Sequence, residues 1–388
     1  MLRNLSRLGV QKFPTTFRSV VSNTINEAKH TITPRSNKIV GYWLGGMAGM
    51  VTGAIFLGGV TRLTESGLSM VDWHPFKELP PMSHDSWVEK FEIYKQFPEY
   101  EYNIKTKGEF TLQDFKRIWW MEYLHRVWGR LIGATFLLPA GYFYMKGYLS
   151  PSMKKKVLLL GSLIGFQGAL GWYMVRSGLE KPYNENESSD IPRVSHFRLC
   201  AHLSSAALLY SLFFWNSLNH LYDYSGLKKF DGVKTLKILG HSTKGVFLVT
   251  FIYGAFVAGM DAGLVYNGWP LMGNSIVPSD LIEEKYRGVI SNLVYNPSAI
   301  QFVHRTLAYT TAGAVSVLWL VTLRSGAPPV IRMASNAIVC ATTLQIILGI
   351  TALVNYVPVY LGSAHQMSSV VLLSTLLYYT NLLKHVPK

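Results

Sequence analysis

Long apolar stretches alternate with polar connections along the chain from about residue 39 to its end. Each stretch has roughly 20 mostly apolar residues, the length at which an α-helix crosses the hydrocarbon core of a bilayer. The pattern therefore predicts an all-α, polytopic membrane protein with eight transmembrane helices. The expected spans are residues 39–62, 118–144, 156–176, 197–219, 241–260, 298–323, 329–354 and 360–383.

The second half of the chain repeats short motifs of the first half. Gly67-Leu68 and Trp73 match Gly263-Leu264 and Trp269, and His125-Arg126 matches His304-Arg305. Gln167 and Gly171 match Gln345 and Gly349. Ala201-His202, followed by Ser204-Ser205, matches Ala364-His365, which is followed by Ser368-Ser369 with one residue inserted. Each half has four spans, so both halves have the same orientation in the membrane. We expect two parallel-repeat four-helix bundles, over 39–222 and 240–384, joined by a linker at 223–239.

The chain carries a net charge of +15, although only 15% of its residues are charged and 49% are hydrophobic. Lys and Arg concentrate in the connections after the second, fourth and sixth spans, which the positive-inside rule places on the side of insertion. Both termini are expected on that side. No soluble basic face of the kind that binds nucleic acid is evident, so membrane lipid and not nucleic acid is the expected partner.

Residues 1–38 contain seven Lys and Arg but a single acid, Glu27, together with many Ser and Thr. This composition is typical of a mitochondrial transit peptide. A basic cytoplasmic arm is the alternative interpretation.

Four histidines lie near the starts of the even-numbered spans: His125, His202, His304 and His365. These spans run in the same direction, so the four imidazoles share one depth, and an ionisable residue at such depth predicts a functional partner. Two imidazoles on facing helices of a bundle can ligate one haem iron from both sides. For any single histidine, a hydrogen bond to a neighbour is the simpler explanation, but the repeated pairing favours one haem site per half.

Glu122 precedes His125 by three residues and shares its helix face. The matching residue before His304 is Gln301, which has no proton to exchange. We therefore expect the first site to react and the second to carry electrons or to be structural. The alternative for Glu122 is an interfacial carboxylate paired with Arg126 or Arg130. Four arginines are candidates for binding haem propionates or for reaching the membrane surface: Arg126, Arg130, Arg198 and Arg305.

The segment Glu122-Tyr123-Leu124-His125-Arg126, the three other histidines and the duplicated layout resemble the haem A synthases of the mitochondrial type. The resemblance covers nearly the whole chain after the leader. It implies oxidation of the C8 methyl group of haem O to a formyl group, which gives the haem A of cytochrome c oxidase. Carried over to this sequence, it implies that His125 and His202 bind the substrate haem O, that His304 and His365 ligate a haem b cofactor, and that Glu122 assists catalysis. Some bacterial members have a cysteine pair in the first outer loop, whereas residues 63–117 contain no cysteine here.

Converting a methyl group to an aldehyde removes four electrons, and two hydroxylations followed by loss of water from a geminal diol are the economical route. The electrons that the hydroxylations consume must come from another protein, because no nucleotide-binding Gly-x-Gly-x-x-Gly between a strand and a helix is present. The resemblance implies a ferredoxin-type donor at the matrix face, and haem O synthase and cytochrome c oxidase assembly factors as further partners. It also implies a location in the mitochondrial inner membrane with both termini in the matrix. The sequence leaves open whether the protein forms a homo-oligomer.

Other functions explain less of the pattern. A transporter predicts broken helices and polar groups near the middle of the membrane. A di-haem electron carrier of the cytochrome b type explains the four histidines but not the difference between Glu122 and Gln301. A di-iron protein needs Glu-x-x-His twice, and a prenyl-transferring haem O synthase needs aspartate-rich motifs. The aromatic outer loop 63–117 either covers the substrate site or receives a partner, or it forms an interfacial aromatic belt.

Overall fold

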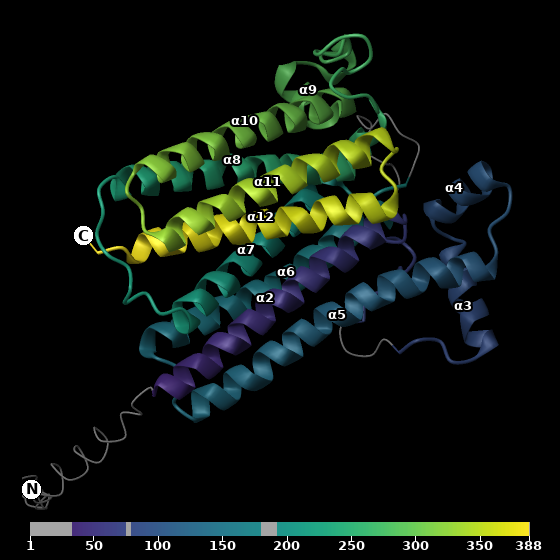
Figure 1. The fold of residues 1–388 in the computed structure, drawn as a ribbon. Helices are drawn as coiled ribbons and strands as arrows, with labels where there is room; N and C mark the ends of the chain where they lie inside the picture. The colour runs from purple at the N-terminus through teal and green to yellow at the C-terminus, as the bar shows by residue number, and fades with distance from the viewer. Residues whose placement is uncertain (1–32, 75–78, 180–191, 388) are drawn as a thin grey trace, which may run out of the picture.

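The computed structural model describes residues 33–74, 79–179 and 192–387, in which there are eleven α-helices and no β-strands. Eight of these helices have 26 residues or more, and they lie side by side (Figure 1). The eight are α2 (Pro34–Leu63), α5 (Leu112–Met145), α6 (Pro151–Leu179), α7 (His196–Leu221), α8 (Val233–Gly259), α10 (Pro297–Arg324), α11 (Pro329–Val354) and α12 (Val359–His385). The shorter helices are α3 (His84–Tyr94), α4 (Pro98–Lys107) and α9 (Val289–Tyr295), and two 3₁₀ turns, η1 (Ala262–Leu264) and η2 (Glu284–Tyr286), follow α8.

The prediction of an all-α polytopic membrane protein is confirmed. Each expected span lies within one long helix, except that α8 ends one residue before residue 260. Six helices are long and apolar enough to cross a membrane: α2, α6, α7, α8, α10 and α11. Helices α5 and α12 are long enough but more polar, so the full count of eight crossings stays a prediction.

The predicted leader falls mostly outside the described residues. Its last five residues, 34–38, form the beginning of α2, where the Thr33 hydroxyl accepts a hydrogen bond from the Ser36 amide and so caps the helix. The expected linker 223–239 is shorter in the structure, because α8 already begins at Val233.

The long helices pack in two closed rings of four. Helices α2 and α6 each pack against both α5 and α7, and α8 and α11 each pack against both α10 and α12. The first ring lies below the second in Figure 1, and the start of α2 and the C-terminus lie at the same end of the molecule. In each ring the two histidine-bearing helices are therefore diagonally opposite.

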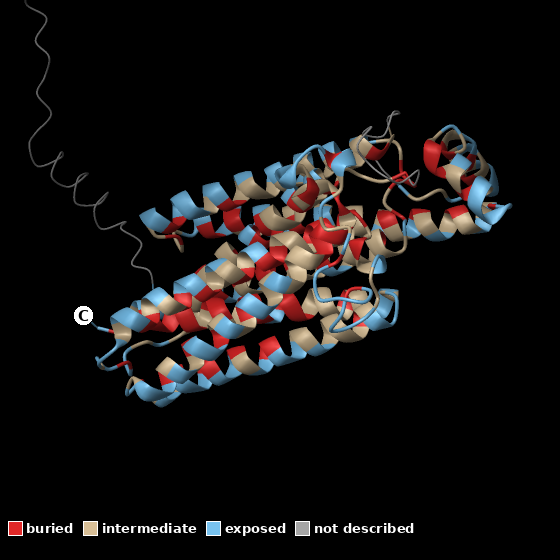
Figure 2. Ribbon diagram, turned by 90° about the horizontal axis from the view of Figure 1, so that it is seen from above, coloured by how far each residue is buried: buried red, intermediate tan, exposed pale blue. Residues whose placement is uncertain are grey.

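Helix α7 of the first ring contacts α8 and α12 of the second, and α2 contacts α12. One buried cluster runs through this contact, with Leu44 and Phe213 on one side and Phe247 and Leu376 on the other. Figure 2 shows buried residues mainly on the inner sides of the helices and exposed residues outside. Exposed residues include large apolar side chains such as Leu138 on α5, which suit a lipid surrounding better than water.

Polar side chains also link the two rings. The Tyr210 hydroxyl on α7 lies 2.5 Å from the Ser374 hydroxyl on α12, and the Asn381 amide of α12 donates to the Asn219 side chain of α7 at 3.1 Å. At the other end of the molecule, Asp261 binds the guanidinium groups of Arg62 (2.9 Å) and Arg193 (2.5 Å). Asp261 follows α8 and has a left-handed backbone, with φ of 49°.

Helices α3 and α4 belong to the first outer loop and pack beside the N-terminal end of α5 (Figure 1). Ser83 and Ser86 cap the start of α3 reciprocally. The aromatic side chains Trp87, Phe91 and Tyr94 are buried against Trp119 and its neighbours on α5. For these three residues the interpretation as an interfacial aromatic belt is wrong, because they form a small core of their own.

Candidate functional site

The histidines of each predicted pair lie on two helices of the same ring. His125 on α5 and His202 on α7 belong to the first ring, and His304 on α10 and His365 on α12 belong to the second. The four side chains are half-buried. The two helices of each pair are diagonally opposite in their ring. Facing helices of a bundle can hold a flat macrocycle between two imidazoles.

The ring nitrogens of these histidines fit a haem. The Nδ1 atoms of His125, His202 and His365 are buried without a hydrogen-bond partner among the described residues. A buried polar atom left unpaired is costly, and an imidazole whose two nitrogens are not both bonded to protein groups can bind a metal through one of them. Among the described residues, no three His, Cys, Asp or Glu side chains gather as a bare metal ion needs. Two imidazoles alone suit an iron whose other four ligands come from a porphyrin.

A glutamine and a serine support one histidine-bearing helix in each half. The Gln167 amide on α6 donates to the His202 carbonyl at 2.8 Å, and the Ser205 hydroxyl donates to the Gln167 oxygen. In the second half the Gln345 amide lies 3.4 Å from Nε2 of His365, and the Ser368 hydroxyl donates to the Gln345 oxygen.

These contacts correct one detail of the sequence repeat. Ser205 follows His202 by three residues and Ser368 follows His365 by three residues, and both bind the equivalent glutamine. The repeat therefore continues through this region without the inserted residue that the sequence comparison assumed.

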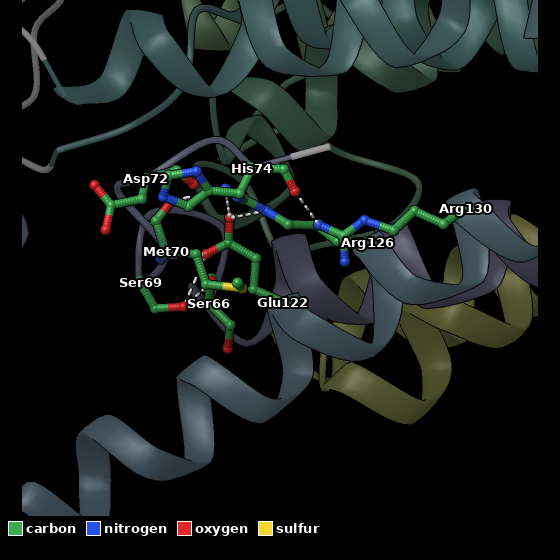
Figure 3. A network of polar contacts seen from close by, with 8 residues as sticks. All are labelled: Ser66, Ser69, Met70, Asp72, His74, Glu122, Arg126 and Arg130. Carbon is green, nitrogen blue, oxygen red and sulfur yellow. Dashed lines mark hydrogen bonds and ion pairs between the residues drawn. The ribbon is translucent and has the colours of Figure 1, made fainter. Parts of the chain in front are cut away.

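Glu122 is buried, with 2% exposure, and its carboxylate accepts four hydrogen bonds (Figure 3). One oxygen accepts from the Ser69 hydroxyl and the Met70 amide, both at 2.8 Å. The other accepts from Nε (3.2 Å) and NH2 (2.7 Å) of Arg126, one turn further along α5. Arg126 also donates to the carbonyls of Met70 (2.6 Å) and Asp72 (2.8 Å). Glu122 and Arg126 together thus hold the loop that follows α2 against α5.

The second half uses equivalent positions for the same purpose. The Gln301 amide donates to the Tyr266 carbonyl at 2.9 Å, and Arg305 donates to the carbonyls of Gly268 (3.3 Å) and Pro270 (2.7 Å). Here an amide and a guanidinium bind carbonyl groups, whereas in the first half a carboxylate also accepts from an amide N–H. The difference between Glu122 and Gln301 therefore matches the backbone groups that the two loops present: an N–H at Met70 in the first half and a carbonyl at Tyr266 in the second.

The alternative explanation of Glu122, pairing with Arg126, is present in the structure. Arg130 instead donates to the His74 carbonyl at 3.0 Å, and Arg198 donates to the Tyr173 carbonyl at 2.7 Å. The four candidate arginines all bind backbone carbonyls, and their binding of propionates stays a prediction, as does a catalytic role for Glu122.

Two buried groups outside these sites were not singled out in the sequence. His196 at the start of α7 packs among the rings of Phe197, Phe256 and Tyr295, as expected for a structural histidine. Glu99 on α4 is buried beside Tyr94, whose hydroxyl donates to it at 3.0 Å. Burial raises the pKa of Glu99 to about 8. Only the folded aromatic core reveals this, because the sequence shows one acid among many in a polar loop.

Comparisons with known proteins agree with this arrangement. Residues 41–377 match the family model COX15-CtaA, described as cytochrome oxidase assembly protein. The chain is 46% identical over 354 residues to a human protein named heme A synthase COX15, covering 91% of this chain and 84% of that protein. It is 44% identical over 379 residues to the mouse protein of the same name, with 97% and 90% covered. A heme A synthase of the bacterium Paramagnetospirillum magneticum is 40% identical over 349 residues, with 88% and 93% covered.

Proposed function

Because the chain belongs to the COX15-CtaA family of cytochrome oxidase assembly proteins, we propose that it is a haem A synthase, which oxidises the C8 methyl group of haem O to a formyl group. The observation that carries this proposal is that each ring of helices has one pair of histidines on diagonally opposite helices. Neither pair has further protein ligands among the described residues, so each suits one haem.

The two sites have different tasks in this proposal. His304 and His365 hold a haem b cofactor, and His125 and His202 hold the substrate haem O. When bound there, haem b would supply one-electron transfer. A ferredoxin-type protein at the matrix face is the proposed electron donor. Haem O synthase and cytochrome c oxidase assembly factors are the proposed partners for delivery of the substrate and use of the product.

Glu122 is the proposed catalytic residue, one helical turn from His125. With two O2 and four electrons from the donor, conversion of the methyl group through an alcohol and a geminal diol to the aldehyde takes up four protons and releases three waters. To take up a proton, the Glu122 oxygen that faces Arg126 must give up one of its hydrogen bonds. Arg126 keeps its two bonds to loop carbonyls when this happens, so the loop stays in place. The loop and Arg126 thereby determine how easily Glu122 exchanges a proton.

The proposed architecture is eight membrane crossings in two parallel-repeat bundles, residues 39–222 and 240–384. Support comes from the two closed rings and from the common end at which α2 starts and the chain ends. The connections after α5, α7 and α10, which are flanked by or contain Lys and Arg, are the proposed matrix side. The proposed location is the mitochondrial inner membrane, with both termini in the matrix and residues 1–38 as a transit peptide.

The test is to produce the protein in cells that make haem O and a ferredoxin-type reductant, and then to extract and separate the pigments. We expect haem A with the wild-type chain and none with His125→Ala. If the pigments contain haem b and unmodified haem O only, with donor and oxygen supplied, the protein is a di-haem electron carrier instead.

A further inference from the structure

Each of the four paired histidines lies against a glycine of a neighbouring helix. A Cβ atom added to any of these glycines would be closest to Cε1 of the imidazole, at a distance of 2.8 to 3.2 Å. The pairs and distances are Gly58 of α2 with His125 (3.1 Å), Gly171 of α6 with His202 (3.0 Å), Gly254 of α8 with His304 (3.2 Å), and Gly349 of α11 with His365 (2.8 Å). We refer to these four residues as the facing glycines.

These contacts leave no room for a methyl group. Carbon atoms in ordinary contact are about 3.5–4.0 Å apart, so an alanine at a facing glycine would force the imidazole or the helix to move. Glycine in a helix interior is less favourable than alanine. The same unfavourable choice occurs at four positions, and at each of them an imidazole edge lies directly over the helix backbone.

The contact of His304 shows what this close approach permits. Nδ1 of His304 lies 3.1 Å from the main-chain oxygen of Thr250, one helical turn before Gly254 on α8. A carbonyl oxygen only accepts, so Nδ1 carries the proton and donates it. Nε2 then has its lone pair free for a metal, and the ring is held by a second bond, as is usual for metal-ligating histidines.

We propose that the facing glycines are positioning residues for the haem-ligating imidazoles. The missing side chain lets each ring lie against the neighbouring helix, which sets the plane in which a ring nitrogen meets the iron. This inference rests on the haem binding of the proposed function. It adds residues on α2, α6, α8 and α11 to sites whose ligands come from α5, α7, α10 and α12.

The second half gives the sharpest test, because a resident haem b cofactor should remain with the purified protein. Gly254→Ala and Gly349→Ala are compared with the wild-type full-length chain by haem b content per protein and by the g values of the oxidised low-spin haem. We expect about tenfold lower haem b content, the lower end of the effect of losing a supporting contact. In the haem that remains, we expect a shifted highest g value, because this value depends on the planes of the two imidazoles.

Matched control variants separate this effect from a general effect of alanine. Gly245→Ala on α8 and Gly313→Ala on α10 add a methyl group where no atom lies within 4 Å. Gly245 precedes Gly254 by nine residues, two and a half turns, and so faces the other side of the helix. Both controls should keep wild-type haem content and g values.

The first half is tested with hemin as the probe, added to protein that already carries haem b. Gly58→Ala and Gly171→Ala should raise the Kd for hemin about tenfold. The controls Gly49→Ala on α2 and Gly165→Ala on α6, which also meet no atom within 4 Å, should leave it unchanged.

Wild-type haem content and unchanged g values in both Gly254→Ala and Gly349→Ala would overturn the inference while leaving the proposed function intact. A lower thermal stability with unchanged g values would overturn it too, since that result indicates a packing role only. Absence of low-spin haem from the wild-type protein itself would instead remove the proposed function together with the inference. Each site has two facing glycines on different helices, so if one variant does not fold, the other decides.

Discussion

Glu122 offers a test that separates a catalytic role from a structural one. Glu122→Ala removes an acceptor of four hydrogen bonds and takes the carboxylate away from Arg126, whose side chain is 8% exposed and still donates to two loop carbonyls. Breaking a buried ion pair by removing one partner costs about 3–5 kcal/mol. We therefore expect a clearly lower Tm for Glu122→Ala, together with a loosened loop after α2.

Glu122→Gln keeps the shape and one acceptor oxygen, which still binds the Ser69 hydroxyl and the Met70 amide. It loses the negative charge that faces Arg126, and a hydrogen bond to a charged group contributes about 1.5–3 kcal/mol to stability. The arrangement then resembles Gln301 and Arg305 in the second half, where no carboxylate is needed. We expect a small fall in Tm and an unchanged content of haem b.

The assay compares Tm, haem b content and haem A yield in the same preparations, at one scan rate because unfolding of such proteins is often irreversible. If Glu122 exchanges a proton, Glu122→Gln should lower the haem A yield by about 10²- to 10⁴-fold, as for loss of a general acid or base. Ser69→Ala is the control, because it removes one hydrogen bond and keeps the carboxylate. A haem A yield near that of the wild type in Glu122→Gln would refute the catalytic reasoning and leave Glu122 as a loop anchor.

Three further predictions follow from other parts of the molecule. His304→Ala or His365→Ala should remove most of the reduced b-type absorption bands, and full haem b in both variants would contradict the cofactor site. Asp261→Asn keeps a residue that tolerates left-handed backbone but loses the ion pairs with Arg62 and Arg193. We expect the free energy of unfolding to fall by about 1–3 kcal/mol, measured as a lower Tm. The control is Glu65→Gln at the matching position in the first half, which should have little effect. Because the pKa of Glu99 is raised, folded α4 binds a proton that the unfolded chain releases, so the stability of α4 should fall as the pH rises from about 4.5 toward 8. Hydrogen exchange of residues 84–107 at pH 5 and 8, corrected for the intrinsic rate, should show this loss of protection in the wild type and not in Glu99→Gln.

The helices and the histidine pairs could be predicted because they depend on regular features of the sequence. Apolar length gives the helices, and the repeat gives the diagonal partners of His125 and His304. The interactions of Glu122 could be predicted only in part. Its pairing with Arg126 follows from helix spacing, but the Met70 amide and the loop carbonyls are backbone groups, which no residue pattern marks.

Other features needed the tertiary structure. Gly171 and Gly349 were recognised as a repeated pair, but their contact with an imidazole depends on how α6 and α11 pack. Gly58 and Gly254 also hold matching positions, nine residues before Gly67 and Gly263, but this match does not stand out among the many glycines of apolar helices. The buried aromatic residues of α3 look in sequence like an interfacial belt, because both arrangements need the same composition.

The contact between the two rings of helices has a consequence for dividing the polypeptide. Acyl chains compete for apolar helix surfaces almost as well as another helix does, so close packing and polar links must select the correct partner. Tyr210 with Ser374 and Asn219 with Asn381 supply such links. Two separately synthesised fragments, divided between α7 and α8, should therefore assemble in one membrane. Substitution of these four side chains should cause the fragments to dissociate before either one unfolds.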